Sequence, residues 1–304
     1  MKRVIISGAT GAVGIALIKK MIEHDIEVLV LCRKNSERNR NIPKHPLVSQ
    51  IECSLENLKD LKNETEKKYD VFYHFAWQGT VGSARNDMYL QNQNVAYALD
   101  AVGVAKRFGC DLFIGAGSQA EYGRVEGVLK PQTPTFPEMG YGMGKLCAGL
   151  MTREYAQQLN MKHVWVRILS VYGPHDGENS MVMSTIKKLQ EGLIPEFTKG
   201  EQLWDYLYSE DAANAFYLLG NSDINGKTYV LGSGQAVPLY KYIDIIHNEV
   251  EPDSKIKLGV IPYGEKQVMH LQADISELEK DVGFEPQIDF KDGIHKILIS
   301  GKEK

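Results

Sequence analysis

Cysteine, long apolar runs and net charge are all scarce in this sequence of 304 residues. Its four cysteines lie far apart, with no CxxC pair and no histidine at metal-ligand spacing, so neither a disulfide framework nor a metal site is expected. No stretch reaches the roughly 20 apolar residues that a membrane-spanning helix needs. The first apolar run stops at Gly8, which is too short for a signal peptide. We therefore expect a cytoplasmic protein with no metal and no membrane partner.

The formal net charge is only −4, which gives no reason to expect a nucleic-acid partner. Hydrophobic residues make up 43% of the chain and charged residues 24%, the balance of a globular protein with a sizeable core. One local feature departs from this background. The apolar run that ends at Cys32 leads directly into a basic loop with Arg33, Lys34, Arg38 and Arg40. This loop needs a specific explanation.

The first half of the chain alternates short apolar strands with amphipathic helices. We expect strands at 3–7, 27–31, 48–53, 71–75, 111–115 and 163–169. We expect helices at 13–23, 55–68 and 94–108. The strands are almost continuously apolar, which is typical of strands covered on both faces. This order predicts an α/β fold with a doubly wound parallel sheet over residues 1–174.

The pattern changes from about His175. We expect helices at 180–190, 209–220, 239–250, 276–281 and 290–300, with short strands near 228–231 and 255–260. Residues 175–304 are therefore predicted to form mainly a smaller α/β lobe, with some segments returning to the first domain. The segment 123–140 contains three prolines and no periodicity, and loops of this length often act as lids over a site.

A glycine-rich turn follows the first predicted strand. The segment VIISGATGAVG places Gly8, Gly11 and Gly14 after that strand and at the start of a helix. Glycines let the backbone turn tightly and approach a pyrophosphate, whose charge the helix N-terminus stabilises. The spacing is GxxGxxG rather than GxGxxG, and such a turn can also be merely a tight connection. Its place in a βαβ pattern favours nucleotide binding, and hence a dinucleotide-binding Rossmann domain.

A tyrosine and a lysine stand four residues apart in the segment YGMGK. Tyr141 and Lys145 share one face if a helix has begun there. The pattern YxxxK arises easily by chance, so its value depends on its position. Ser118 precedes it and follows the strand DLFIGAG, where a site at the C-terminal edge of a parallel sheet would lie. Ser118 could equally be a turn or helix-capping residue.

Together these segments resemble the extended short-chain dehydrogenase/reductase family, in the branch that acts on nucleotide-linked sugars. Further similar motifs follow in the family's order over most of the chain: YHFAWQG, NVAYALDAV, VRILSVYGP, WDYLYSEDAA and QADISELEKDVGFEP. The sequences of these motifs are most similar to those of reductases that act on nucleotide-linked 4-keto-6-deoxyhexoses. A nucleotide sugar is therefore the expected substrate.

The resemblance implies a role for each matching residue. Tyr141 would be the general acid–base that exchanges a proton with a sugar oxygen while hydride moves to or from a nicotinamide. Because an unperturbed tyrosine titrates at about 10, it needs a nearby charge, which Lys145 would supply, and Ser118 would hydrogen-bond the same oxygen. The implied cofactor-binding residues are Gly8, Thr10, Gly11, Val13, Ser54, Leu55, Phe75, Ala76, Trp77, Asn94, Tyr141 and Lys145. The implied substrate-binding residues are Trp77, Ser118, Gln119, Tyr141, Ser170 and Trp204.

Some positions depart from the family pattern. Members that dehydrate a nucleotide sugar carry an Asp–Glu pair after the Ser or Thr, whereas this chain has Gln119 and Ala120. A dehydratase is therefore not expected, and Glu121 stands one position too late to replace the pair. The family often has Asn where this chain has Ser170 and Arg where it has Trp204, so contacts to a substrate diphosphate are in doubt. Trp204 could also be an ordinary core residue.

The basic loop bears on the cofactor. Family members that use NAD end the second strand on an acidic residue, which accepts hydrogen bonds from the adenosine ribose. That position is Cys32 here, and Arg33 follows it. Arg33, with Lys34 or Arg38, can pair with the 2′-phosphate of NADP, which a carboxylate would repel. The charges alone also fit a solvated loop, but the missing acid is a separate fact, so we expect NADP(H).

The cofactor in turn bears on the reaction, because a reductase consumes NADPH whereas an epimerase of this family keeps NAD bound. We expect NADPH-dependent reduction of the C4 keto group of a nucleotide-linked 4-keto-6-deoxyhexose, in deoxysugar biosynthesis for polysaccharides or antibiotics. The alternatives are a nucleotide-sugar 4-epimerase with bound NAD and, from another class, a non-catalytic NADP-binding sensor. The nucleotide base, the sugar, the product stereochemistry and assembly into a homodimer stay open.

Overall fold

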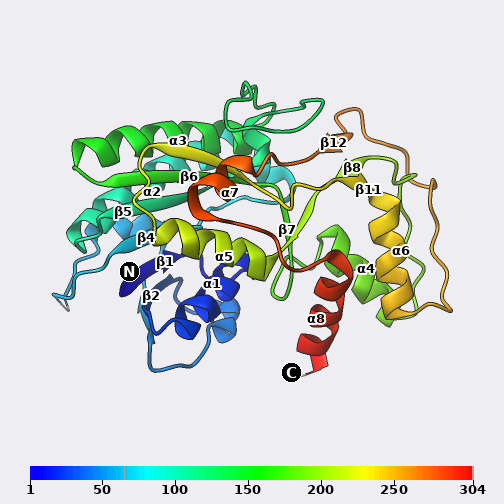
Figure 1. Cartoon of the computed structure of the whole chain (residues 1–304), viewed down its shortest axis with the longest axis horizontal. Coiled ribbons are helices and arrows are strands. Elements are labelled where there is room, and N and C mark those ends of the chain that lie inside the picture. Colours follow the sequence, from blue (N-terminus) through cyan, green and yellow to red (C-terminus); the bar gives the residue numbers. More distant parts are fainter. Residues whose placement is uncertain (65, 303–304) are drawn as a thin grey trace.

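A parallel sheet forms the centre of the molecule (Figure 1) in the computed structural model, which describes residues 1–64 and 66–302. Within these residues the sheet has seven strands. From one edge to the other they are β3 (Val48–Glu52), β2 (Glu27–Cys32), β1 (Arg3–Ser7), β4 (Val71–His74), β5 (Leu112–Ser118), β6 (Lys162–Ile168) and β10 (Lys227–Leu231). The strand order reverses between β1 and β4. In sheets of this kind, ligands bind outside the carboxyl ends of the strands at such a reversal.

Helices cover both faces of the sheet. On one face lie α1 (Ala12–Glu23) and α5 (Ser209–Gly220), and on the other α2 (Met88–Arg107) and α3 (Gly140–Gln158), each pair packed side by side (Figure 1). Side chains of β1 alternate between the two resulting cores: Val4 and Ile6 join one, and Ile5 joins the other. Burial on both faces explains why the strands are almost continuously apolar. The predicted doubly wound α/β fold is confirmed.

The second half of the chain builds a smaller lobe and also returns to the main sheet. The lobe contains β7 (Ser170–Tyr172), α4 (Met181–Gln190), β8 (Leu203–Trp204), β9 (Tyr206–Tyr208), β11 (Val237–Pro238), α6 (Leu239–Val250), β12 (His270–Leu271) and α8 (Phe290–Lys302). Rings of Tyr172, Tyr206, Tyr242 and Phe290 pack against one another at its centre. By contrast, β10 pairs with β6, and α5 packs on α1. The helix α7 (Ser276–Val282) packs on α5 and accepts a hydrogen bond from Tyr229 of β10 through Asp281. These three late elements therefore extend the first domain.

One predicted helix is wrong. Among the described residues of the predicted helix 55–68, only Leu55–Asp60 are helical, and they form the short 3₁₀ helix η2. Arg107 of α2 explains the early end, because its guanidinium hydrogen-bonds the carbonyl oxygens of Leu58, Lys59 and Leu61. Those acceptors are therefore not available to a continuing helix.

One predicted strand is also wrong. Residues 255–260 make a single isolated bridge, between Glu196 and Lys257, rather than a strand. The apolar side chains that suggested a strand, Leu258 and Val260, are exposed. With no core to bury them, the segment runs as a loop held by backbone hydrogen bonds to residues 195–198.

Two histidines are buried in a row of rings that crosses the sheet. His74 of β4, Phe113 of β5 and His163 of β6 lie at centroid distances of 6.0 and 5.7 Å. Ser7 Oγ lies 2.8 Å from His74 Nδ1, and Thr152 Oγ1 lies 2.9 Å from His163 Nε2. Neither His74 Nε2 nor His163 Nδ1 has a hydrogen-bond partner among the described residues. Burial lowers the pKa of each histidine from 6.5 to about 3, so both are neutral at physiological pH.

We expect these histidines to make the fold sensitive to acid. In the unfolded chain these histidines bind protons below about pH 6.5, whereas in the folded chain they do so only near pH 3. Their contribution to the free energy of unfolding is therefore fully present above pH 6.5 and decreases as the pH falls from 6.5 towards 3. Each histidine should contribute a loss of about 2 kcal/mol between pH 7 and pH 5. His163→Gln should remove its own share, which is about half of the combined loss of the two histidines. The surface variant His45→Gln should not reduce the loss. Both are measured by urea unfolding at the two pH values. An unchanged loss in His163→Gln would contradict this origin.

Candidate active site

A groove of about 570 Å³ lies at the reversal point of the sheet. Its walls come from four segments: the turn after β1, the end of β2 with the basic loop, the segment after β3, and the segment after β4. Predicted cofactor residues that line it are Gly8, Thr10, Gly11, Arg33, Leu55, Phe75, Ala76 and Trp77. These residues come from four separate segments of the chain. The structure therefore brings together residues that were predicted to bind the same dinucleotide cofactor.

The glycine turn is shaped for a close backbone approach. Gly8 has φ +73°, and a Cβ there would collide with the backbone nitrogen of Ala76. Gly11 is the residue before α1, and no side chain caps the free backbone N–H groups of that helix. A Cβ on Gly11 would meet only Arg38 Nη2, at 3.9 Å. The turn thus leaves an uncapped helix N-terminus facing the groove, which suits a pyrophosphate.

Other predicted cofactor residues lie outside the lining. Val13, Lys34 and Ser54 belong to neighbouring segments and do not line the groove. Asn94 is buried in α2, where its Oδ1 accepts from the backbone N–H of Gln78 at 2.9 Å and its Nδ2 donates to the Gln78 carbonyl at 2.9 Å. Asn94 therefore supports the wall after β4 from behind.

Ser118, Tyr141 and Lys145 converge beside this groove. Ser118 ends β5, and α3 begins at Gly140, so Tyr141 and Lys145 occupy its first turns. Burial raises the pKa of Tyr141, whereas a hydrogen bond with the Ser118 side chain opposes that rise. Lys145 Nζ donates to the Ala116 carbonyl at 2.7 Å. Neither Tyr141 nor Lys145 lines the groove itself.

Trp77 connects the groove to these residues. Lys145 Nζ lies 4.0 Å from the centroid of the Trp77 ring, and the Tyr141 ring meets Trp77 edge-on at 6.3 Å. Trp77 Nε1 donates to Gln91 Oε1 at 2.7 Å, which holds the indole in place. Burial lowers the pKa of Lys145 to about 7, and the charge of Glu121 opposes this. Lys145 can therefore change its charge near neutral pH.

Glu121 has a structural role that the sequence interpretation missed. Its buried carboxylate accepts from the Ser118 backbone N–H at 2.8 Å, from Trp165 Nε1 at 3.0 Å and from Arg167 Nε at 2.7 Å. The Ser118 hydroxyl in turn accepts from the Ala120 N–H at 3.2 Å, which completes a capping box around η4 (Gln119–Glu121). The SxxE pattern in SQAE was the available signal. With its oxygens engaged, Glu121 is a structural residue, and the half-buried Gln119 begins the same turn.

Ser170 and Trp204 lie together in the smaller lobe. Trp204 Nε1 donates to Ser170 Oγ at 2.8 Å, and the Trp204 carbonyl accepts from Tyr242 O–H at 3.0 Å. The two predicted substrate residues therefore bind each other across β7 and β8. Both are half-buried, so the indole contributes to the core as well as to the surface.

The predicted lid, residues 123–140, is held at both ends. Arg124 pairs with Glu138 at 2.7 Å, which joins its first and last turns. Leu129 bridges to Ala273, and Arg167 Nη1 donates to the Pro131 carbonyl at 3.1 Å. The loop thus contacts both the sheet and the smaller lobe. Its closure over a substrate stays a prediction.

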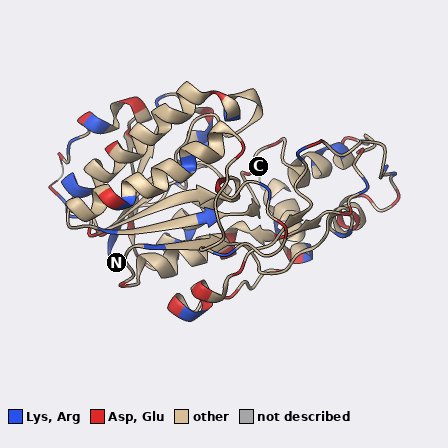
Figure 2. Ribbon diagram, turned by 90° about the horizontal axis from the view of Figure 1, so that it is seen from above, with Lys and Arg blue, Asp and Glu red and all other residues tan. Residues whose placement is uncertain are grey.

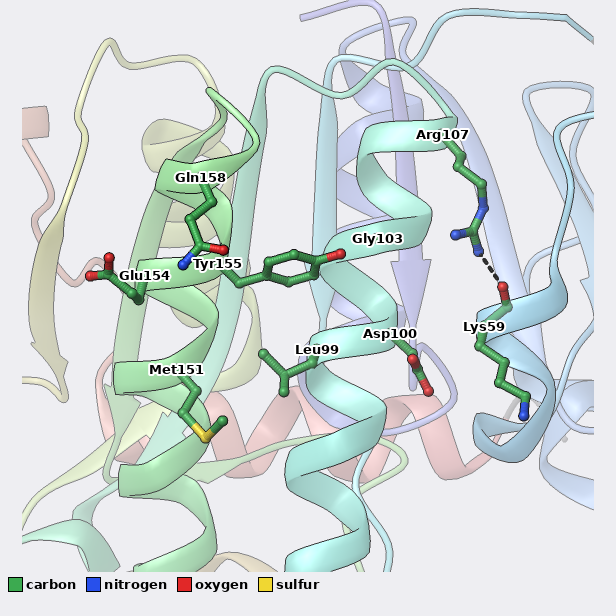
Figure 3. A pocket seen from close by; sticks show the side chains of 9 residues that line it. All are labelled: Lys59, Leu99, Asp100, Gly103, Arg107, Met151, Glu154, Tyr155 and Gln158. Atoms are coloured by element: carbon green, nitrogen blue, oxygen red, sulfur yellow. Dashed lines mark hydrogen bonds between the residues drawn. The ribbon is translucent and has the colours of Figure 1, made fainter.

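A second hollow lies away from these residues. It has a volume of about 480 Å³ and lies between α2 and α3, with Leu99 and Tyr155 projecting into it (Figure 3). None of the predicted site residues lines it.

Acidic and basic residues are interspersed over the helices and loops (Figure 2), so the basic loop after β2 is a local feature. Among the described residues no helix is long and apolar enough to cross a bilayer.

A glycine turn at the reversal of a parallel sheet, next to a buried serine, a buried lysine and a half-buried tyrosine, is typical of nucleotide-binding proteins of the Rossmann class. Residues 4–232 match the model of the NAD dependent epimerase/dehydratase family, and the chain belongs to that family. Its enzymes are of the oxidoreductase and epimerase type and act on nucleotide sugars. The predicted family resemblance is confirmed.

Relatives in this family differ in their reactions. CDP-abequose synthase of Salmonella typhimurium is 25% identical, over 97% of this chain and 97% of its own length. The dTDP-4-dehydro-6-deoxyglucose reductase of Escherichia coli is 24% identical, over 98% of this chain and 96% of its own length. The structure of UDP-glucuronic acid 4-epimerase from Bacillus cereus in complex with NAD has a TM-score of 0.84, with 19% identity and 99% coverage of both chains. The structural neighbour therefore shows the shared fold, and the two curated relatives show the range of reactions named in the family.

Proposed function

We propose that the protein is an NADPH-dependent reductase of the C4 keto group of a nucleotide-linked 4-keto-6-deoxyhexose. The observation that carries the proposal is the groove wall at the end of β2, where Arg33 lines the groove and no carboxylate ends the strand. The glycine turn, where a Cβ on Gly8 would collide with backbone, is a cradle that fits the pyrophosphate of a dinucleotide. A reductase of this kind would serve deoxysugar biosynthesis, and the names of the abequose synthase and 4-dehydro-6-deoxyglucose reductase relatives support that class.

The end of β2 favours the 2′-phosphate of NADP over the free ribose of NAD. The Cys32 thiol is buried and points to Gln50 and the Ile51 carbonyl, each at 3.7 Å, so it offers the ribose nothing. Arg33 is exposed at the groove and forms no ion pair within the described residues. Arg38 already donates to the His175 carbonyl at 2.9 Å. Of the three basic candidates, Arg33 is the one that both lines the groove and keeps its guanidinium available.

The chemistry then falls to the residues at the start of α3. When bound, the cofactor supplies the hydride that reduces the keto carbon. Tyr141 would donate its phenolic proton to the C4 oxygen, and Ser118 would hydrogen-bond that oxygen as its negative charge develops. Lys145, held by the Ala116 carbonyl, would stabilise the phenolate left on Tyr141. Glu121 would keep Ser118 in place through its backbone N–H.

A nucleotide-sugar 4-epimerase with bound NAD is the second candidate. The epimerase names of several structural relatives favour it, as does the NAD in the Bacillus cereus complex. A non-catalytic NADP sensor is a third candidate, but such a protein would not require a serine, a tyrosine and a lysine close together.

The experiment that tests the proposed reaction follows the oxidation of NADPH with 4-keto-6-deoxyhexoses linked to dTDP, CDP, UDP and GDP. Turnover with any of them, without return to the starting sugar, supports the reductase. A homodimer and a cytoplasmic location stay predictions.

Arg33→Ala should weaken NADPH binding by about 10–150-fold, because a charge-assisted contact to phosphate contributes roughly 1.5–3 kcal/mol. NADH binding should barely change, since it has no 2′-phosphate. Both affinities can be measured by quenching of protein fluorescence. Arg40→Ala is the matched control, because it removes the same charge from an exposed position of the same loop that does not line the groove. Equal affinity for both reduced cofactors in the wild type, with NAD retained through purification, would favour the epimerase instead.

A further inference from the structure

Arg85 lies against the ring of the predicted acid–base residue, and neither the sequence motifs nor the family pattern assigned it a role. Its guanidinium carbon is 4.4 Å from the centroid of the Tyr141 ring, which is closer than Lys145 Nζ at 6.0 Å. Arg85 is half-buried and forms no ion pair with any described residue. A half-buried arginine that faces an aromatic ring rather than a carboxylate brings a net positive charge to that position.

The local backbone holds Arg85 in this position. It belongs to η3 (Gly82–Asn86), and its Nη1 donates to the Thr80 carbonyl at 3.1 Å. The next residue, Asn86, accepts the backbone N–H of Gly140 through Oδ1 at 3.0 Å, which ties η3 to the first residue of α3. A Cβ on Gly140 would come within 3.3 Å of the Arg85 carbonyl oxygen, so the two segments approach closely. Tyr141 follows directly, and its ring is therefore placed under the guanidinium.

Four charged or polar groups surround the Tyr141 phenol. Ser118 at the end of β5 hydrogen-bonds it, Glu121 of η4 disfavours its ionised form, and Arg85 of η3 favours that form. Lys145 of α3 is the fourth, but burial lowers its pKa to about 7. The help that Lys145 can provide therefore fades as the pH rises above neutrality. A guanidinium keeps its charge over the whole range in which the protein is folded.

We propose that Arg85 is a positioning residue that sets the ionisation of Tyr141 by holding a permanent positive charge against its ring. A cation at the ring face stabilises the phenolate, which carries a full negative charge, more than the neutral phenol. Proton donation by Tyr141 leaves such a phenolate, so the contact strengthens as the proton leaves. This inference rests on the proposed role of Tyr141 and adds a second cation to it. Arg85 then maintains proton transfer at pH values where Lys145 is neutral.

The ionisation of Tyr141 can be observed without turnover. Protein labelled with ¹³Cζ-tyrosine and saturated with NADP⁺ should be titrated by NMR from about pH 8 to about pH 12, and the midpoints compared through the fraction of Tyr141 ionised at each pH. The Tyr141 signal is identified from Tyr141→Phe. Arg85→Met keeps the aliphatic part of the side chain, and we expect it to raise the titration midpoint of Tyr141 by about 1–2 pH units. Arg85→Lys should give a smaller rise, because it retains the charge without the planar group. Arg153→Met removes the same charge from an exposed position of α3 and should leave the midpoint unchanged.

The same midpoint in wild type and Arg85→Met would overturn the inference, as would a lower midpoint in Arg85→Met than in wild type. An arginine that serves only to hold an anionic substrate would give the first of these results. The readout also separates this inference from the proposed reaction. A protein inactive towards every 4-keto sugar, whose Tyr141 still titrates in an Arg85-dependent way, would refute the reaction and keep the role of Arg85.

Discussion

Replacing Tyr141 with phenylalanine is expected to lower turnover by about 10²–10⁴-fold, the usual contribution of a general acid–base group. The phenol contacts Ser118 and lies beside Lys145 and Arg85. Its loss removes the proton donor and the phenolic oxygen whose ionisation these groups influence. NADPH affinity should change little, because Tyr141 does not line the groove that holds the predicted cofactor residues. The measurement is kcat with saturating 4-keto sugar, together with the dissociation constant of NADPH.

Tyr155→Phe is the matched control for this variant. It removes the same hydroxyl from the same helix, at a position that lines the hollow between α2 and α3 (Figure 3). Its turnover should equal that of the wild type. Turnover of Tyr141→Phe within about threefold of wild type would remove Tyr141 from the mechanism, because so small a loss is below the range of acid–base catalysis.

Removing Glu121 is expected to give the largest loss of stability, roughly 3–5 kcal/mol for Glu121→Ala in urea unfolding. The side chain is fully buried and forms a 2.7 Å ion pair with Arg167, which is itself buried. Without the carboxylate, the guanidinium, Trp165 Nε1 and the Ser118 N–H lose their acceptor in a site that water does not reach. The guanidinium also lies 4.6 Å from the Tyr122 ring, which gives it little freedom to move towards solvent.

The double variant Glu121→Ala/Arg167→Met tests the origin of this loss. It should be less destabilised than the sum of the two single variants, because it leaves no charge buried without a partner. As a surface comparison, Glu196→Ala removes the partner of Lys257 from a half-exposed pair and should cost at most about 1 kcal/mol. Strict additivity of the two buried substitutions, or a cost for Glu121→Ala no greater than for Glu196→Ala, would contradict the role of the pair.

Local patterns in the sequence were sufficient for the sheet and for the candidate site residues that follow it. Strands buried on both faces are apolar throughout, and a turn that requires φ +73° at Gly8 requires glycine, so both leave a direct mark on the sequence. Ser118 and Tyr141 are separated by the loop 123–140 in the chain. They still meet, because the end of a parallel strand and the start of the next helix lie at the same edge of the sheet.

Contacts between distant segments have no local pattern, and these were decided only by the tertiary structure. Arg107 takes the carbonyl oxygens on which a helix after Leu55 would have depended, although residues 55–68 by themselves favour a helix. The Glu121 carboxylate accepts a hydrogen bond from Arg167, which lies 46 positions further along the chain. Arg85 reaches Tyr141 because Asn86 binds the first residue of α3. The sequence by itself thus determined the class of fold and the residue types of the site, through backbone conformation and burial. Which charges surround the Tyr141 phenol was decided by packing, since electrostatic interactions depend on distance in space and not on distance along the chain.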